Sequence, residues 1–228
     1  MGEMVEFPSN GGTGTGYLAA PEVGAGLGLI VIQEWWGLVP HIKAVCDRFA
    51  AEGFTALAPD LYHGAHTTEP DEAGKLLMTL NLPQAAKDMS GAVDFLLQSD
   101  RVRGEGVGVT GFCMGGGLTL MLAVQRPDAV AAAVPFYGFI PWESAQPDWS
   151  TLAAPVLGHY GQLDEFFSPE KAQELEATLK GLGKEADFHI YEGAHHAFFN
   201  DTRPEVYDEH AASTAWIRTL EFLRSKLG

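Results

Sequence analysis

Cys113 lies in a glycine-rich segment, GVGVTGFCMGGG, that spans residues 106–117. Gly111 and Gly115 flank it two positions away on each side, which gives the pattern G-x-C-x-G. This pattern is typical of a strained strand–turn–helix step with a nucleophile at its tip, because only small residues fit at the neighbouring positions. A helix that begins after the cysteine would favour the thiolate and offer the Met114 N–H to an oxyanion. The alternative is a small apolar cysteine packed beside glycines.

A candidate acid and two candidate bases follow Cys113 along the chain. The segment HYGQLDEFF places Asp164 in a turn after a predicted strand, and YEGAHHAFF places His195 and His196 in a loop after the next strand. The order nucleophile, acid, histidine is the order of α/β enzymes that activate a nucleophile with a histidine. The residues alone do not choose between the two histidines, and Asp164 by itself could be a turn or N-cap residue.

Alternating strands and helices must position these residues. Because β-branched apolar runs alternate with segments of helical apolar spacing, we expect one α/β domain over residues 1–228, with a mostly parallel central sheet and helices on both faces. Residues at the carboxyl ends of such strands form the site, while Asp60 is better explained as a turn former. The expected strands are 27–33, 54–60, 106–111, 129–138, 154–161 and 186–192, and the expected helices are 41–51, 84–98, 114–125, 169–182 and 205–227.

Composition and charge narrow the setting. The 228 residues carry a formal net charge of −16, which argues against nucleic acid or an anionic membrane as the main partner. Cys46 and Cys113 make no disulfide framework and no zinc-type spacing, and His63 and His66 lack a third metal ligand. We see no signal peptide in the first residues and no apolar run long enough to cross a bilayer, so we expect a cytoplasmic protein.

The motifs VIQEWWGL, APDLY, GFCMGG, GQLD and YEGAHHAF together resemble the dienelactone hydrolase (carboxymethylenebutenolidase) family of α/β hydrolases. They occur in the family order and cover roughly residues 13–226 of the chain. The resemblance implies a compact α/β-hydrolase domain with little or no lid. It also implies hydrolysis of esters, especially enol lactones, without a metal or organic cofactor.

The resemblance implies a role for each residue of the site. Cys113 corresponds to the nucleophile, Asp164 to the acid that orients the histidine, and Glu34 to a glutamate that interacts with the resting thiol. The family pattern G-A-x-H-x-F, found here at 193–198, selects His196 as the base. A carboxylate near the sulfur disfavours the thiolate and can accept its proton. We therefore hypothesise that substrate binding transfers the thiol proton to Glu34; otherwise Glu34 only lines the pocket.

The resemblance also implies an oxyanion hole made by the main-chain N–H groups of Trp35 and Met114. Several aromatic residues follow predicted strands and could form an apolar pocket, although packing in the core must account for some of them. The residues that we predict to line the substrate pocket are Trp35, Tyr137, Phe198 and Arg203.

This chain departs from the family where a substrate carboxylate is bound. Asn200 stands where the family has an arginine shortly after the catalytic histidine, Arg203 lies further on, and residues 64–88 contain lysines but no arginine. We predict a cysteine-dependent hydrolase of carboxylic esters or lactones that works through a thioester, as a monomer or small homo-oligomer. The alternatives are a broader esterase or thioesterase on neutral substrates, or a redox-sensing protein on the same fold.

Overall fold

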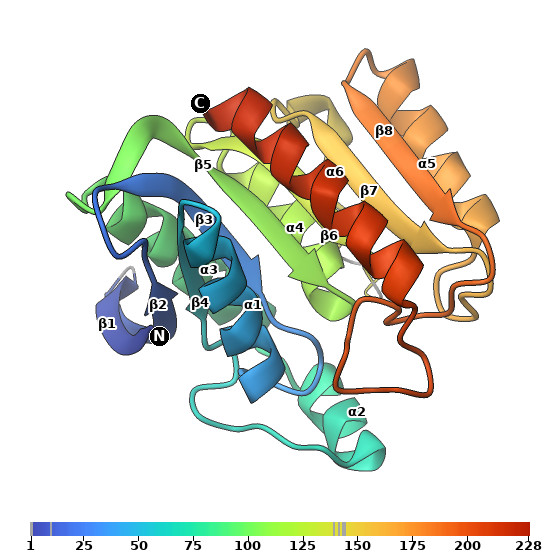
Figure 1. Cartoon of the computed structure of the whole chain (residues 1–228), viewed down its shortest axis with the longest axis horizontal. Helices are drawn as coiled ribbons and strands as arrows, with labels where there is room; N and C mark the ends of the chain where they lie inside the picture. The colour runs from blue at the N-terminus through green and yellow to red at the C-terminus, as the bar shows by residue number, and fades with distance from the viewer. Residues whose placement is uncertain (1, 10, 139, 141, 143–144) are drawn as a thin grey trace.

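The structure is a computed structural model and describes residues 2–9, 11–138, 140, 142 and 145–228. Within these residues, eight strands form one sheet in the order β1-β2-β4-β3-β5-β6-β7-β8. The pairs β1–β2 and β2–β4 are antiparallel, and every other neighbouring pair is parallel (Figure 1). The strands are β1 (Glu3–Ser9), β2 (Gly12–Ala19), β3 (Gly26–Ile32), β4 (Phe54–Pro59), β5 (Val102–Phe112), β6 (Val130–Phe136), β7 (Val156–Gly161) and β8 (Ala186–Tyr191).

Helices cover both faces of the sheet. On one face, α1 and α6 bury their apolar sides in a cluster that includes Cys46, Phe49 and Leu223. On the other face, α3, α4 and α5 contribute to a second cluster that includes Met89, Leu118 and Leu179. The α-helices are α1 (Pro40–Ala51), α2 (Pro70–Met78), α3 (Leu82–Leu97), α4 (Met114–Gln125), α5 (Pro169–Gly181) and α6 (Glu209–Leu227).

The predicted fold class, a mostly parallel sheet with helices on both faces, is confirmed. The sequence did not predict the β1–β2 hairpin, because the glycines and threonines of β2 hide its alternation of exposed and buried residues. It also did not predict α2, whose one fully buried residue is Ala73. The last helix begins at Glu209 instead of residue 205. The side chain of Asp208 caps this start, because it accepts the N–H of Ala211.

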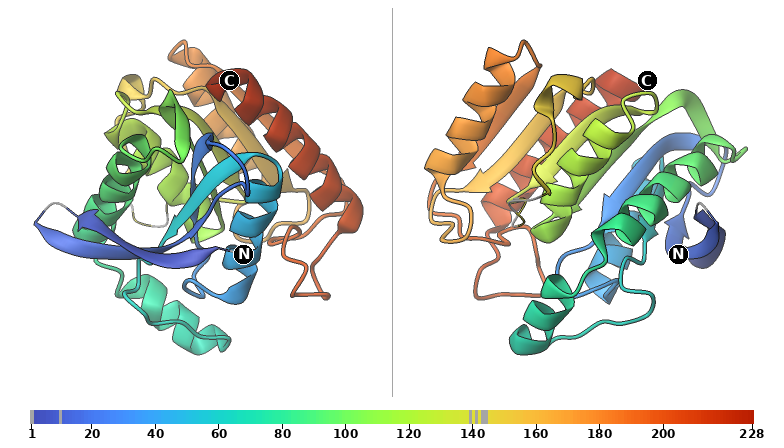
Figure 2. Two further views of the ribbon diagram at one scale, coloured as in Figure 1. Left: turned by 60° about the vertical axis from the view of Figure 1, so that its left-hand side comes forward. Right: turned by 180° about the vertical axis from the view of Figure 1, so that it is seen from behind.

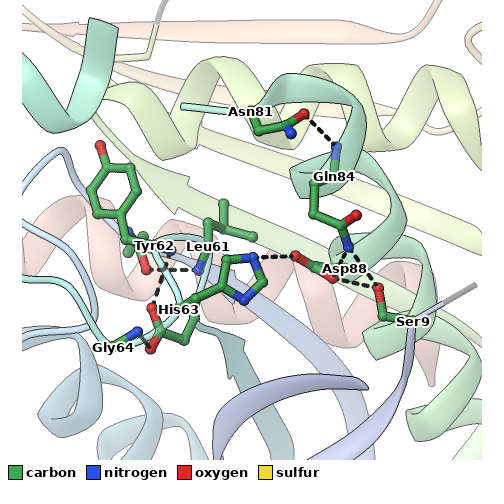
Figure 3. Close-up of polar contacts among 10 residues, drawn as sticks. Ser9, Leu61, Tyr62, His63, Gly64, Asn81, Gln84 and Asp88 are labelled. Carbon is green, nitrogen blue, oxygen red and sulfur yellow. Dashed lines mark hydrogen bonds and ion pairs between the residues drawn. The ribbon is translucent and has the colours of Figure 1, made fainter. Parts of the chain in front are cut away.

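A buried carboxylate joins the edge hairpin to the rest of the fold (Figure 3). Asp88 on α3 accepts hydrogen bonds from the hydroxyl of Ser9 at the end of β1 and from Gln84. Its other oxygen lies 3.2 Å from Nε2 of His63, in the loop after β4. In the same loop Asp60 accepts two backbone N–H groups, as a turn former does. This loop leads to α2, which lies beyond the carboxyl ends of the parallel strands (Figures 1 and 2).

Candidate active site

Cys113 occupies a strained turn between β5 and α4. Its φ of 57° and ψ of −120° are a combination that residues other than glycine rarely adopt. Both flanking glycines are required by close backbone approaches. A Cβ atom on Gly111 would lie 2.2 Å from the carbonyl oxygen of Gly115, and one on Gly115 would lie 2.4 Å from that of Gln33. The glycines therefore let the chain turn tightly enough to present Cys113, which is half-buried, at the carboxyl end of the sheet.

His196 and Asp164 form a close pair. Nδ1 of His196 lies 2.7 Å from Oδ2 of Asp164, and the aspartate side chain is buried. The backbone N–H groups of Phe166 and Phe167 donate to the other oxygen, Oδ1, so both oxygens are fixed. His195, the other candidate base, is exposed. The structure thus brings Asp164 together with His196.

The side chain of Cys113 also acts on the ring of His196. Burial lowers the pKa of His196, but the charge of Cys113 and the hydrogen bonds to Asp164 and Cys113 outweigh it and raise the pKa to about 10. The negative charges near the ring thus stabilise the imidazolium form of His196. The rings of Tyr137 and Phe166 each lie with their centroid 5.0 Å from that of His196.

Glu34 lies just after β3, with its side chain buried. Its Oε2 accepts a hydrogen bond of 2.8 Å from Nδ2 of Asn200, which is also buried. Within the described residues, this is the one side-chain donor to the Glu34 carboxylate. The structure therefore pairs Cys113 with His196 and Glu34 with Asn200.

A cavity of about 330 Å³ opens in front of Cys113. Most of its lining is apolar, and α2 contributes two of the residues. The charged residues among those that line it are Glu34, His196 and Arg203. The guanidinium of Arg203 lies over the ring of Trp36 and donates to Glu205. The lining residues are Glu34, Trp35, Trp36, Pro70, Leu77, Cys113, Met114, Phe166, His196, Ala197 and Arg203.

Two of the four predicted pocket residues, Trp35 and Arg203, line this cavity. The other two do not, and their prediction is corrected here. Phe198 is fully buried and packs against the rings of Tyr137 and Tyr191. Tyr137 is also fully buried and lies behind His196. Both residues follow a strand along the chain, as pocket residues do. Their side chains nevertheless lie in the core, where each packs against other aromatic rings.

Trp35 and Met114 both line the same cavity. Met114 is the first residue of α4, so its N–H has no partner within the helix. In the described part of the chain, the N–H of Trp35 donates to no acceptor either. Tyr62, from the loop after β4, places its hydroxyl 3.4 Å from Sδ of Met114. Free N–H groups beside a nucleophile can hold a developing negative charge.

Comparisons with known proteins show the family of this chain. Residues 15–227 match the model of the dienelactone hydrolase family. The chain belongs to the dienelactone hydrolase family. It is 39% identical to "Protein usf" of Aquifex pyrophilus and 35% identical to a protein of Aquifex aeolicus named "Putative carboxymethylenebutenolidase", over the full length of each chain.

A solved structure of a family member superposes closely on this chain. The protein is from Klebsiella pneumoniae, its title calls it "Putative Dienelactone Hydrolase", and it shares 28% identity with a TM-score of 0.88 over 98% of both chains. The dienelactone hydrolase family assignment makes this chain an ester or lactone hydrolase on an α/β-hydrolase fold. None of its described helices is long and apolar enough to cross a membrane.

Sequence reasoning missed part of this dienelactone hydrolase-family site. Pro70 and Leu77 belong to α2, which has too few buried residues to be recognised in the sequence. Phe166 is 64% exposed, and its position two residues after Asp164 is the signal that could have found it. Asn200 was noted only as the residue in place of an arginine, whereas it contacts Glu34. Over the residues described, no group of three or more His, Cys, Asp or Glu side chains could hold a metal ion.

Proposed function

We propose that this chain hydrolyses carboxylic esters or lactones with Cys113 as nucleophile, His196 as base and Asp164 as the acid that orients it. The observation that carries this proposal is the arrangement around His196, whose Nδ1 lies 2.7 Å from Oδ2 of Asp164 and whose pKa is raised most by the charge of Cys113. A cysteine on a strained turn, a histidine and a fixed carboxylate are the parts that nucleophilic acyl transfer needs.

In the first step the Cys113 sulfur attacks the carbonyl carbon of the substrate. The carbon–sulfur bond forms, and the carbonyl electron pair moves to the oxygen, which accepts hydrogen bonds from the N–H groups of Trp35 and Met114. Each such donor is typically worth about 3 kcal/mol in the transition state. The carbon–oxygen bond of the ester then breaks, and the leaving oxygen takes the proton of the His196 imidazolium. The product of this step is a thioester on Cys113.

In the second step His196 activates water against the thioester. Acylation removes the negative charge from the sulfur, and that charge is the largest influence that raises the pKa of His196. The pKa of His196 therefore falls in the acyl-enzyme, and the neutral imidazole can take a proton from water. The water oxygen bonds to the carbonyl carbon, the carbon–sulfur bond breaks, and the thiolate again pairs with the imidazolium. Ester and water thus give acid and alcohol.

A second candidate, a broader esterase or thioesterase on neutral substrates, is favoured by the cavity lining. Arg203 is the one arginine or lysine among the residues that line it, and its guanidinium is engaged by Glu205 and Trp36. A neutral acyl group would fit against Trp35, Phe166 and Leu77 without a cation. The net charge of −16 supports a small-molecule substrate and argues against nucleic acid or membrane partners. We expect a cytoplasmic monomer or small homo-oligomer without a cofactor.

The test is hydrolysis of cis-dienelactone and a series of p-nitrophenyl esters by the wild type and by Cys113→Ala. We expect turnover that Cys113→Ala abolishes, and a mass increase equal to the acyl group on Cys113 when the reaction is quenched early. Turnover of the lactone favours the first candidate, whereas turnover of neutral esters alone favours the second. Equal turnover by wild type and Cys113→Ala would overturn both.

A redox-sensing protein on the same fold predicts a different outcome. Such a protein would turn over neither kind of substrate, and its Cys113 would oxidise reversibly under dilute peroxide. The same quenched mass measurement would then show an oxidised thiol and no acyl adduct. A matched control is Cys46→Ala, because Cys46 is fully buried on α1 and stands outside the cavity. We expect that variant to hydrolyse esters as the wild type does.

A further inference from the structure

The Asn200 side chain is held in one orientation. Its Oδ1 accepts hydrogen bonds from the backbone N–H of Thr202 at 3.1 Å and from the Thr202 hydroxyl at 2.6 Å. Because two donors face Oδ1, the amide nitrogen Nδ2 must point the other way, toward Glu34. The loop that carries Asn200 is tied to α1 as well, since Asp201 lies 3.3 Å from Nδ1 of His41. Asn200 is therefore a fixed donor.

The hydrogen bond from Asn200 is the main polar contact of the Glu34 carboxylate among the described residues. Both Glu34 and Asn200 are about 1–2% exposed, so water does not replace the hydrogen bond between them. Across the described ranges, Glu34 forms no ion pair, and Arg203, the one arginine or lysine in the cavity lining, is paired with Glu205. A buried carboxylate without a cation depends on neutral donors. Removal of the Asn200 amide would leave the Glu34 carboxylate to find another donor.

Two other groups around Glu34 can donate a hydrogen bond, the thiol of Cys113 and the hydroxyl of Tyr137. Cys113 lines the same cavity as Glu34. The buried hydroxyl of Tyr137 has no partner among the described residues. Burial raises the pKa of Tyr137 well above its ordinary value, and the charges of Glu34 and Cys113 raise it further. If Glu34 turned to the sulfur, its negative charge would disfavour the thiolate that pairs with His196.

We propose that Asn200 is a positioning residue that holds the Glu34 carboxylate and so leaves the Cys113 sulfur to His196. This inference rests on the proposed function, in which Cys113 is the nucleophile. The hydrogen bonds of the site divide into two sets: Thr202 to Asn200 to Glu34, and His196 to Asp164. In this arrangement the thiol is reactive before a substrate arrives, in contrast to the substrate-triggered transfer to Glu34 that the sequence suggested.

The test is the rate at which iodoacetamide alkylates Cys113 as a function of pH. Asn200→Leu keeps the size of the side chain but removes the donor. We expect it to slow alkylation at neutral pH by about tenfold or more, because a nearby like charge commonly shifts the equilibrium between thiol and thiolate by that factor. The midpoint of the pH profile should move upward. In the background Glu34→Gln, which has no carboxylate to release, the same Asn200→Leu change should leave the rate and the midpoint unchanged.

Two outcomes would overturn the proposal. Asn200→Leu would have no effect in either background if Asn200 does not control Glu34. It would slow alkylation equally in both backgrounds if its role is only to hold the loop. Glu192→Gln, at an exposed position earlier in the loop between β8 and α6, is the control and should alkylate like the wild type. Labelling reports on Cys113 because Cys46 is fully buried, and burial raises the pKa of the Cys46 thiol.

Alkylation needs no ester substrate, so the two proposals fail separately. If Cys113→Ala still hydrolyses esters, the proposed function fails while the dependence of alkylation on Asn200 and Glu34 can still hold. If hydrolysis depends on Cys113 but the two backgrounds respond alike to Asn200→Leu, only the role of Asn200 fails. Thr202→Val adds a graded test, because it removes one of the two donors that orient Asn200. We expect a change in the same direction as Asn200→Leu and smaller.

Discussion

One carboxylate oxygen of Asp164 lies 2.7 Å from Nδ1 of His196, and the other accepts backbone N–H groups of its own turn. The side chain thus both forms the turn after β7 and fixes the imidazole. The two roles explain why the sequence alone left Asp164 open to interpretation as a turn residue. A substitution that keeps the turn but changes the group that faces His196 can test the two roles separately.

Asp164→Asn should keep the fold and lose most of the hydrolytic rate. Its carbonyl oxygen can still accept the N–H groups of Phe166 and Phe167, which turns the amide N–H₂ toward His196 and forces the wrong tautomer of the imidazole. The corresponding change in a serine protease lowers kcat by about 10⁴-fold, and we expect a loss of the same order here. The measurement is kcat for p-nitrophenyl acetate.

The matched control for Asp164→Asn is Asp60→Asn. Asp60 is also a buried aspartate at the end of a strand and accepts two backbone N–H groups in its turn, but among the described residues no histidine ring bonds to its carboxylate. Asparagine keeps one of the two acceptor oxygens, so we expect Asp60→Asn to lower stability modestly and to change kcat by less than about threefold. An equal loss in both variants would mean that the turn, and not the contact with His196, sets the rate.

Gly111→Ala and Gly74→Ala should shift stability in opposite directions. At Gly111 the added methyl group would lie 2.2 Å from the oxygen of Gly115, so the turn that presents Cys113 must distort. At Gly74, on α2, the methyl group would meet nothing within 4 Å. We expect a loss of about 3 kcal/mol or more at Gly111 and a gain of about 0.5–1 kcal/mol at Gly74. Urea unfolding measures both, and a stable Gly111→Ala with normal turnover would contradict the tight turn.

Tyr137→Phe tests whether this buried tyrosine acts through its ring or its hydroxyl. The hydroxyl is buried without a partner in the described part of the protein, so its loss should leave stability unchanged or raise it by about 1 kcal/mol. The ring, 5.0 Å from that of His196, is retained, and KM should stay within about twofold because the residue does not line the cavity. Phe166→Ala, at the cavity wall, should raise KM. A raised KM in Tyr137→Phe would return Tyr137 to the substrate pocket.

The sequence predicts the parts of this fold that carry strong periodicity. The strands around Val109 and Leu157 are apolar runs, and their parallel pairing places Cys113, Asp164 and His196 at one edge of the sheet. The tight turn leaves no room for a side chain at Gly111, so it requires a glycine there. This requirement makes the G-x-C-x-G pattern recognisable in the sequence. Signals that are fixed by the local backbone can be read from the sequence.

What the sequence does not predict depends on where a side chain points. Phe198 and Phe166 are both aromatic residues beside the site, yet one is buried in the core and the other is largely exposed at the cavity wall. The partner of Glu34 is 166 residues away at Asn200, and no periodicity relates them. Such contacts follow from the packing of whole segments, which a single sequence does not contain.

His159 should make the protein less stable in mild acid. Its ring is fully buried between the hydroxyls of Tyr191 and Thr219, and burial, with the nearby charges of His189 and Arg218, lowers its pKa well below the ordinary value of 6.5. Below about pH 6.5 His159 therefore binds a proton in the unfolded chain but not in the folded chain. The free energy of unfolding is unaffected by His159 above that pH and decreases as the pH falls below it. We expect the free energy of unfolding in urea to drop between about pH 7.5 and pH 5.5, and the drop to be smaller in His159→Gln. Exposed His210→Gln should behave as the wild type, and an equal drop in His159→Gln would show that other groups bind the proton.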